Sequence, residues 1–156
     1  LLNWVSPFTP EQVLECYRSE AAKATAAIAL LDVALEKVEG DDHRRLARET
    51  AVARFHAVQT LSAANVVDFL LTRNAFYTAE EAAKKRELLD RIEAICRAEA
   101  ENAASALPLL DADSRLGWHG EAYGYMIDRR LVEEKLARLE QLLSERLPQE
   151  RAALGA

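Results

Sequence analysis

The chain has 156 residues, of which 50% are apolar and 29% charged, and its formal net charge at pH 7 is −6. This length is sufficient for one domain with a hydrophobic core, and the composition is not that of a disordered chain. The acidic balance and the lack of a basic stripe argue against a nucleic-acid partner. No run approaches the ~20 apolar residues of a membrane span, so no membrane partner is expected either.

Residues 1–8, with the sequence "LLNWVSPF", begin with large apolar side chains rather than with methionine. Chain termini are usually polar because they extend into water. We therefore interpret residues 1–8 as a lead-in from a preceding domain, and we expect an upstream domain of the same protein as a partner. Removal of a tag or a signal would leave a similar start, and the compartment is not indicated.

Helix signals follow in chain order. Thr9, Pro10 and Gln12 form a capping box with proline at the first helical position, which predicts a helix from residue 10 to about residue 38. A second helix is expected over residues 42–73, followed by a break at residues 74–77. Thr78 and Glu81 then predict a capping box at the start of a third helix, which Pro108 should kink or end. The last helix is expected over residues 129–147, closed by Pro148.

Each predicted helix carries one apolar face at alternating spacings of three and four residues. Four such helices joined by short links are typical of an all-α, antiparallel up-and-down four-helix bundle. We place this bundle at residues 9–148, with residues 149–156 as a C-terminal tail and an ordered glycine- and aromatic-rich loop before the last helix.

Two polar residues, Glu99 and Asn102, interrupt the apolar stripe of the third helix. Glutamate is almost never buried without a partner. Either these residues form a polar layer with His56, Gln59 or Asn65 that lines a small pocket, or the stripe drifts and both reach solvent. No Glu-x-x-His pair, nucleophile motif or phosphate-binding loop is present, so we assign no metal, no cofactor and no catalytic residue.

The connection over residues 111–128 contains three of the five glycines, one of the two tryptophans and the single methionine. It is longer than most links between bundle helices, and it lacks the composition of a flexible linker. Aromatic planes beside charged groups favour recognition of a sugar or a protein surface. The candidate binding residues are Asp113, Arg115, Trp118, His119, Glu121, Tyr123 and Tyr125.

The same composition also fits a compact loop over the open end of the bundle. In that interpretation Trp118, Tyr123 and Met126 would fill the top of the core, and Arg115 would pair with Asp111 or Asp113. The two interpretations are compatible, because an ordered cap can also be a binding surface.

Residues 113–117 ("DSRLG"), residues 124–126 ("GYM") and the helix that follows resemble the C-terminal helical region of large bacterial carbohydrate-active, glycoside-hydrolase-like proteins. The opening "NWVSPFTPEQVLECYR" is similar to the start of that region. The resemblance covers the link and the last helix, and it includes no catalytic residue. It implies a C-terminal accessory domain, with carbohydrate as a candidate ligand, rather than a complete enzyme.

The leading hypothesis is therefore a non-catalytic accessory domain whose 111–128 loop contacts a neighbouring domain or a ligand. One alternative is a freestanding helical module that forms a homo-oligomer. A weaker alternative is a small enzyme in which His119 and Glu121 act as an acid–base pair.

Overall fold

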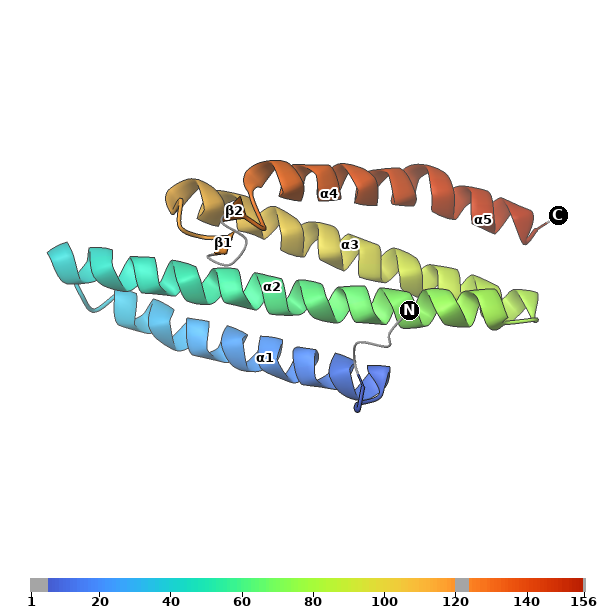
Figure 1. Cartoon of the computed structure of the whole chain (residues 1–156), viewed down its shortest axis with the longest axis horizontal. Helices are drawn as coiled ribbons and strands as arrows, with labels where there is room; N and C mark the ends of the chain where they lie inside the picture. The colour runs from blue at the N-terminus through green and yellow to red at the C-terminus, as the bar shows by residue number, and fades with distance from the viewer. Residues whose placement is uncertain (1–5, 120–123, 156) are drawn as a thin grey trace.

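The computed structural model describes residues 6–119 and 124–155. Figure 1 shows long helices packed along one another, with a short two-stranded element before the last of them. The last helix continues without a break through a π-helical turn, η2, into a final segment. The elements are α1 (Pro10–Leu35), α2 (Gly40–Thr78), α3 (Ala82–Ala112), β1 (Trp118–His119), β2 (Gly124–Tyr125), α4 (Arg129–Gln141), η2 (Leu142–Arg146) and α5 (Leu147–Ala153).

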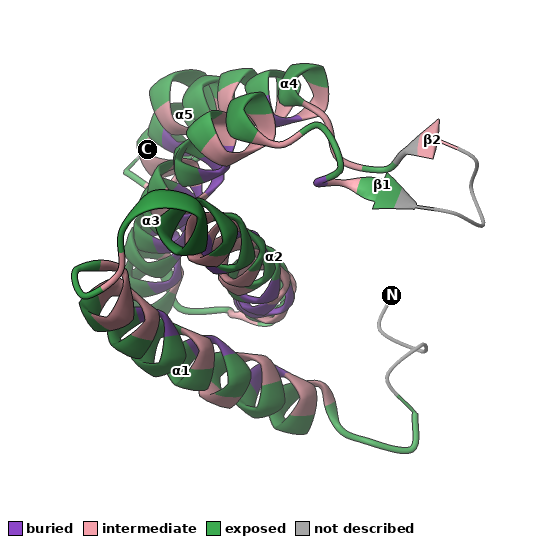
Figure 2. Cartoon of the chain, turned by 90° about the vertical axis from the view of Figure 1, so that its left-hand side faces the viewer, coloured by how far each residue is buried: buried purple, intermediate pink, exposed green. Residues whose placement is uncertain are grey.

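Consecutive helices make the principal contacts: α1 packs on α2, α2 on α3, and α3 on α4 and α5. Figure 2 shows α1 and α4 on opposite sides of the α2–α3 pair, with most buried positions facing between the helices. The all-α class and the bundle-like packing of the helices are thus confirmed. Within the described part of the chain, no helix is both long and apolar enough to span a membrane.

The predicted start of α1 is confirmed in detail. The Thr9 hydroxyl accepts from the backbone N–H of Gln12 at 3.2 Å, and the Gln12 side chain accepts from the backbone N–H of Thr9 at 2.8 Å. Both donors lie in the first turn, where no helical carbonyl is available to them.

The predicted boundary between the second and third helices is wrong. Helix α2 continues through residues 74–77 to Thr78, whose hydroxyl donates to the carbonyls of Asn74 and Ala75, both at 3.2 Å. Thr78 therefore lies in the last turn of α2 instead of capping α3. The reason is burial, because the continued helix places Phe76 in the same core cluster as Leu89 and Leu147.

Pro108 was predicted to kink or end its helix and Pro148 to close the last one, and neither proline ends its helix. Helix α3 passes through Pro108 to Ala112, and the last helix continues beyond Pro148 to Ala153. Just before Pro148, η2 widens the helix so that the N–H of Leu147 donates to the carbonyl of Leu142. Arg151 of α5 then pairs with Asp90 and Glu93 of α3, at 2.6 Å in each case, and these ion pairs hold the continued helix on its neighbour.

Most of the buried apolar residues that the structure describes belong to three clusters. One joins α1 to α2 through Leu14, Ala64 and Val67. The other two lie at opposite ends of α3. The first contains Phe76, Leu88, Leu89, Ile92, Cys96 and Leu147. The second contains Phe55, Ala103, Ala106, Leu116 and Val132.

Candidate functional site: the loop before α4 and the adjacent pocket

Leu116 anchors the loop between α3 and α4. Its side chain is buried against Phe55, Ala106 and Val132, so the loop contributes directly to the core. Two residues further on, β1 and β2 pair antiparallel, with Trp118 opposite Tyr125 and His119 opposite Gly124. The described parts of the loop, residues 111–119 and 124–128, are therefore tied to the core and to each other.

Gly117 joins the first part of the loop to its last residues before α4. Its carbonyl accepts hydrogen bonds from the backbone N–H groups of Met126 at 3.0 Å and Ile127 at 3.4 Å. Its φ is +78°, a region that side chains disfavour, and a Cβ at this position would lie 1.9 Å from the carbonyl oxygen of Ile127. Only glycine satisfies both conditions, since the backbone of residue 127 occupies the space that a side chain would need.

The ion pair predicted for Arg115 forms with Asp113 and not with Asp111. Arg115 donates to the two carboxylate oxygens from Nε at 2.9 Å and from Nη2 at 2.6 Å. These bonds, together with one from the Arg115 backbone N–H, lower the pKa of Asp113 to about 2. Asp111 pairs instead with Arg129 of α4, which also lowers the pKa of Asp111.

The expectation that Trp118 and Met126 fill the top of the core is wrong. Trp118 is 53% exposed and Met126 is 60% exposed. Leu116 and Ile127 pack in the core instead, because the Gly117 contact turns these two residues inward. The loop thus packs two aliphatic side chains against the core and leaves Trp118 and Met126 exposed.

The remaining candidate residues of the loop are not placed. Glu121 and Tyr123 lie outside the described residues, and for His119 and Tyr125 only the backbone is described. The acid–base pair suggested for His119 and Glu121 and the aromatic contact suggested for Tyr123 and Tyr125 therefore stay predictions.

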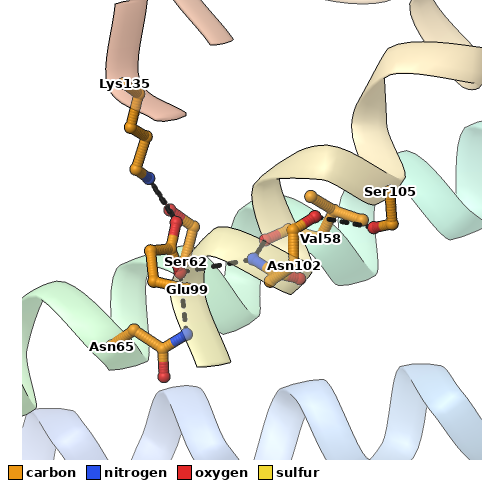
Figure 3. A network of polar contacts seen from close by, with 7 residues as sticks. All are labelled: Val58, Ser62, Asn65, Glu99, Asn102, Ser105 and Lys135. Atoms are coloured by element: carbon orange, nitrogen blue, oxygen red, sulfur yellow. Dashed lines mark hydrogen bonds and ion pairs between the residues drawn. The ribbon is translucent and has the colours of Figure 1, made fainter. Parts of the chain in front are cut away.

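Glu99 is the centre of a buried polar layer, which confirms one of the two interpretations of this residue. Its side chain is only 4% exposed, and Figure 3 shows groups from three helices converging on it. Ser62 and Asn65 of α2 each donate to the carboxylate at 2.7 Å, and Lys135 of α4 pairs with it. Asn102 donates to it at 3.4 Å and to the carbonyl of Val58 at 3.0 Å.

Of the three residues proposed to join this layer, Asn65 does so, and Gln59 lines a pocket beside it. His56 lies elsewhere, with its Nε2 atom 3.8 Å from a carboxylate oxygen of Glu20 on α1. Ser62 and Lys135 were not predicted. Lys135 could have been found, because it has Leu131 and Leu139 four residues away on either side and therefore lies on the apolar face of its helix.

A pocket of about 220 Å³ lies beside this layer. Its polar end is formed by Gln59, Ser62, Glu99, Asn102 and Lys135, and its walls are apolar. Ile127 is one of the wall residues, so the closure of the loop at Gly117 also shapes the pocket. The apolar wall residues are Phe55, Val58, Ala103, Ala106, Ile127, Leu131 and Val132.

The donors around Glu99 compensate the cost of burying its carboxylate. A buried carboxylate is costly unless hydrogen bonds and an opposite charge compensate it, and here Ser62, Asn65, Asn102 and Lys135 supply both. The arrangement fixes the side chains at the polar end of the pocket in place. Among residues 6–119 and 124–155, no group of three or more His, Cys, Asp or Glu side chains is arranged to hold a metal ion.

Comparison with protein-family models, with curated proteins and with solved structures finds no match to this chain.

The loop closure gives a first prediction. Gly117→Ala should lower the free energy of unfolding by about 2 kcal/mol or more, because the strained φ is combined with a clash against backbone. Gly40→Ala is the matched control: Gly40 also has a positive φ, of 60°, but a Cβ there would have no atom within 4 Å. Its cost should be nearer ~1 kcal/mol. Urea denaturation gives the free energy of unfolding of both variants. Equal losses would show that the contact with Ile127 adds nothing to the cost at Gly117.

A second prediction concerns the buried carboxylate. Glu99→Ala should destabilise the fold by about 2–4 kcal/mol, because it leaves the half-buried donors of Ser62 and Asn65 without their acceptor. The lower value of this range takes into account that the Lys135 ammonium can turn to water in the variant, since its side chain is 37% exposed. Glu101→Ala, at an exposed position of the same helix, should change stability by less than ~0.5 kcal/mol. Similar effects of the two substitutions in urea denaturation would contradict a buried polar layer.

A third prediction concerns pH. Carbon-detected NMR titration should give Asp113 a pKa of about 2, and Arg115→Gln should return that pKa towards its ordinary value of 3.8. Since the folded pKa lies below the unfolded one, the ion pair stabilises the loop above about pH 4 and is lost as the pH falls towards 2. An Asp113 pKa near 3.8 in the unaltered chain would mean that the pair does not persist in solution.

Proposed function

We propose that this chain is a non-catalytic helical accessory domain that binds a neighbouring domain of a larger, carbohydrate-related bacterial protein through the 111–128 loop. The observation that carries the proposal is the exposure of Trp118 and Met126 on a loop that is fixed from beneath by Leu116 and Gly117. Tryptophan and methionine are enriched at protein interfaces, and tryptophan is prominent among the residues that dominate binding energy.

The anchoring of the loop supports this role, because a surface that is already ordered loses less conformational entropy on binding. The ion pairs Arg115–Asp113 and Arg129–Asp111 place charged groups on the same loop and at the start of α4. An apolar centre with charged neighbours is the usual composition of an interface.

The carbohydrate context of the proposal is supported by the resemblance of residues 113–117 and 124–126 to the helical ends of glycoside-hydrolase-like proteins. A sugar is a secondary candidate ligand of the same surface, since the flat indole of Trp118 offers apolar area with a hydrogen-bonding edge. The antiparallel up-and-down path of the helices belongs to this proposal too. The short links between α1 and α2 and between α2 and α3 support it, since short links favour antiparallel neighbours.

The experiment has two stages. The native polypeptide is first isolated with an antibody to this segment, and its intact mass is measured. A mass well above 17.4 kDa is expected, and a mass equal to 17.4 kDa would overturn the accessory-domain proposal.

In the second stage, the longer polypeptide carries Trp118→Ala with Met126→Ala. Loss of docking should make the segment between this domain and its neighbour at least about tenfold more sensitive to limited proteolysis, with helical circular dichroism unchanged. Tyr77→Ala, at an exposed aromatic residue near the end of α2, serves as the control. Equal protection in all three forms would show that the loop does not dock.

A second candidate function is a freestanding homo-oligomeric module, which the exposed Leu30 and Val33 of α1 favour. Such a module should melt at a higher temperature at higher protein concentration, because association stabilises the folded state by mass action. A melting temperature that does not move over a hundredfold dilution would remove this candidate.

A further inference from the structure

The pocket beside Glu99 has two chemically distinct parts. One end presents polar side chains, and the rest of the lining is aliphatic or aromatic. The polar residues are Gln59, Ser62, Glu99, Asn102 and Lys135. A purely structural polar layer needs no apolar space beside it, since well-packed interiors contain few voids larger than a water molecule. A pocket with apolar walls and a few fixed polar groups has instead the composition of a small-molecule site.

The size of the pocket limits what can bind. A cavity of about 150 Å³ with apolar lining is known to accept benzene. The volume here, about 220 Å³, therefore suits a six-membered ring with a short substituent. The side chains of Phe55, Val58 and Val132 would surround the ring, and the substituent would extend towards Lys135.

The bonding of Lys135 indicates the kind of substituent. Its ammonium group has three N–H donors, and two of them bind Glu99 and Ser62 within the described part of the chain. The third has no acceptor among the described residues, and because the side chain is 37% exposed and lines the pocket, it is open to water or to a ligand. A carbonyl or hydroxyl oxygen on the ligand would complete the hydrogen bonding of this group.

The charges indicate that the ligand is neutral. Glu99 and Lys135 form an ion pair, so their charges compensate each other at the polar end of the pocket. An anionic ligand would face the Glu99 carboxylate, and a cationic ligand would face the Lys135 ammonium. Either would also lose its hydration on entry without a full counter-charge, which is costly.

From these observations we propose that the pocket between α2, α3 and α4 binds an uncharged amphipathic molecule, with a ring-sized apolar body and a carbonyl or hydroxyl head that accepts a hydrogen bond from Lys135. This goes beyond the docking role of the loop, because the pocket is lined by the helices and shares only Ile127 with the loop.

The test is isothermal titration calorimetry of the full chain with three probes of one shape: phenylacetamide, phenylacetate and 2-phenylethylammonium. Phenylacetamide should bind with a Kd below about 1 mM, and at least about tenfold more tightly than either charged probe. Absence of phenylacetamide binding, or tighter binding of a charged probe, would overturn the proposal.

Two variants locate the binding. Ala106→Leu adds three carbon atoms to the pocket wall without altering the polar end, and it should abolish phenylacetamide binding. Ala26→Leu, at an exposed site on α1, is the matched control and should bind as the unaltered chain does. Lys135→Met keeps the apolar stem of the side chain and should weaken binding at least about tenfold.

Circular dichroism and the melting temperature establish that each variant is folded before it is titrated. If Lys135→Met does not fold, the comparison of the three probes and the Ala106→Leu variant still decide the question. Unchanged phenylacetamide binding by folded Ala106→Leu would place the binding outside this pocket and overturn the proposal.

Discussion

The burial of one carboxylate, that of Glu99, constrains the position of three helices. A carboxylate that is only 4% exposed must be matched by donors, and these come from α2 on one side and α4 on the other. Helix α4 makes its principal contacts with α3, so the ion pair of Lys135 adds a specific link that fixes its register. With α4 in place, Ile127, just before the helix, bonds to Gly117 in the loop and forms part of the pocket wall.

A second buried acid performs the same task for α1. Asp68 of α2 is largely buried, and it binds Arg18 of α1 at 2.6 Å and Arg91 of α3 at 2.7 Å. Each outer helix is thus tied to the central α2–α3 pair by a cation that reaches a buried carboxylate. Apolar packing alone would allow amphipathic helices to slide along one another, whereas an acid with defined partners permits one register. This is the role in specificity that buried ionic groups have in other helical assemblies.

Features decided by neighbouring residues were predictable from the sequence, and those decided by distant ones were not. The cap at Thr9 and the start of α4 depend on local hydrogen bonds, and both lie where the sequence places them. The break expected at residues 74–77 is absent because the burial of Phe76 outweighs a weak local signal. Glu99 stands out as a polar residue in an apolar stripe, and Lys135 as a cation on the apolar face of its helix, but the two are 36 residues apart and no local pattern pairs them. Of the two interpretations of Trp118, packing in the top of the core is wrong, because Leu116 and Ile127 occupy the core beside Gly117 instead.

The central claim is that the contact between Glu99 and Lys135 holds α4 in place, and a double-mutant cycle tests it most directly. Glu99→Gln, Lys135→Met and the double variant keep the side-chain volumes similar, and urea denaturation gives the free energy of unfolding of each. We predict a coupling energy of at least about 1 kcal/mol, because either single change leaves the other buried or half-buried charge without its partner. Effects of the two substitutions that add within about 0.5 kcal/mol would contradict the account.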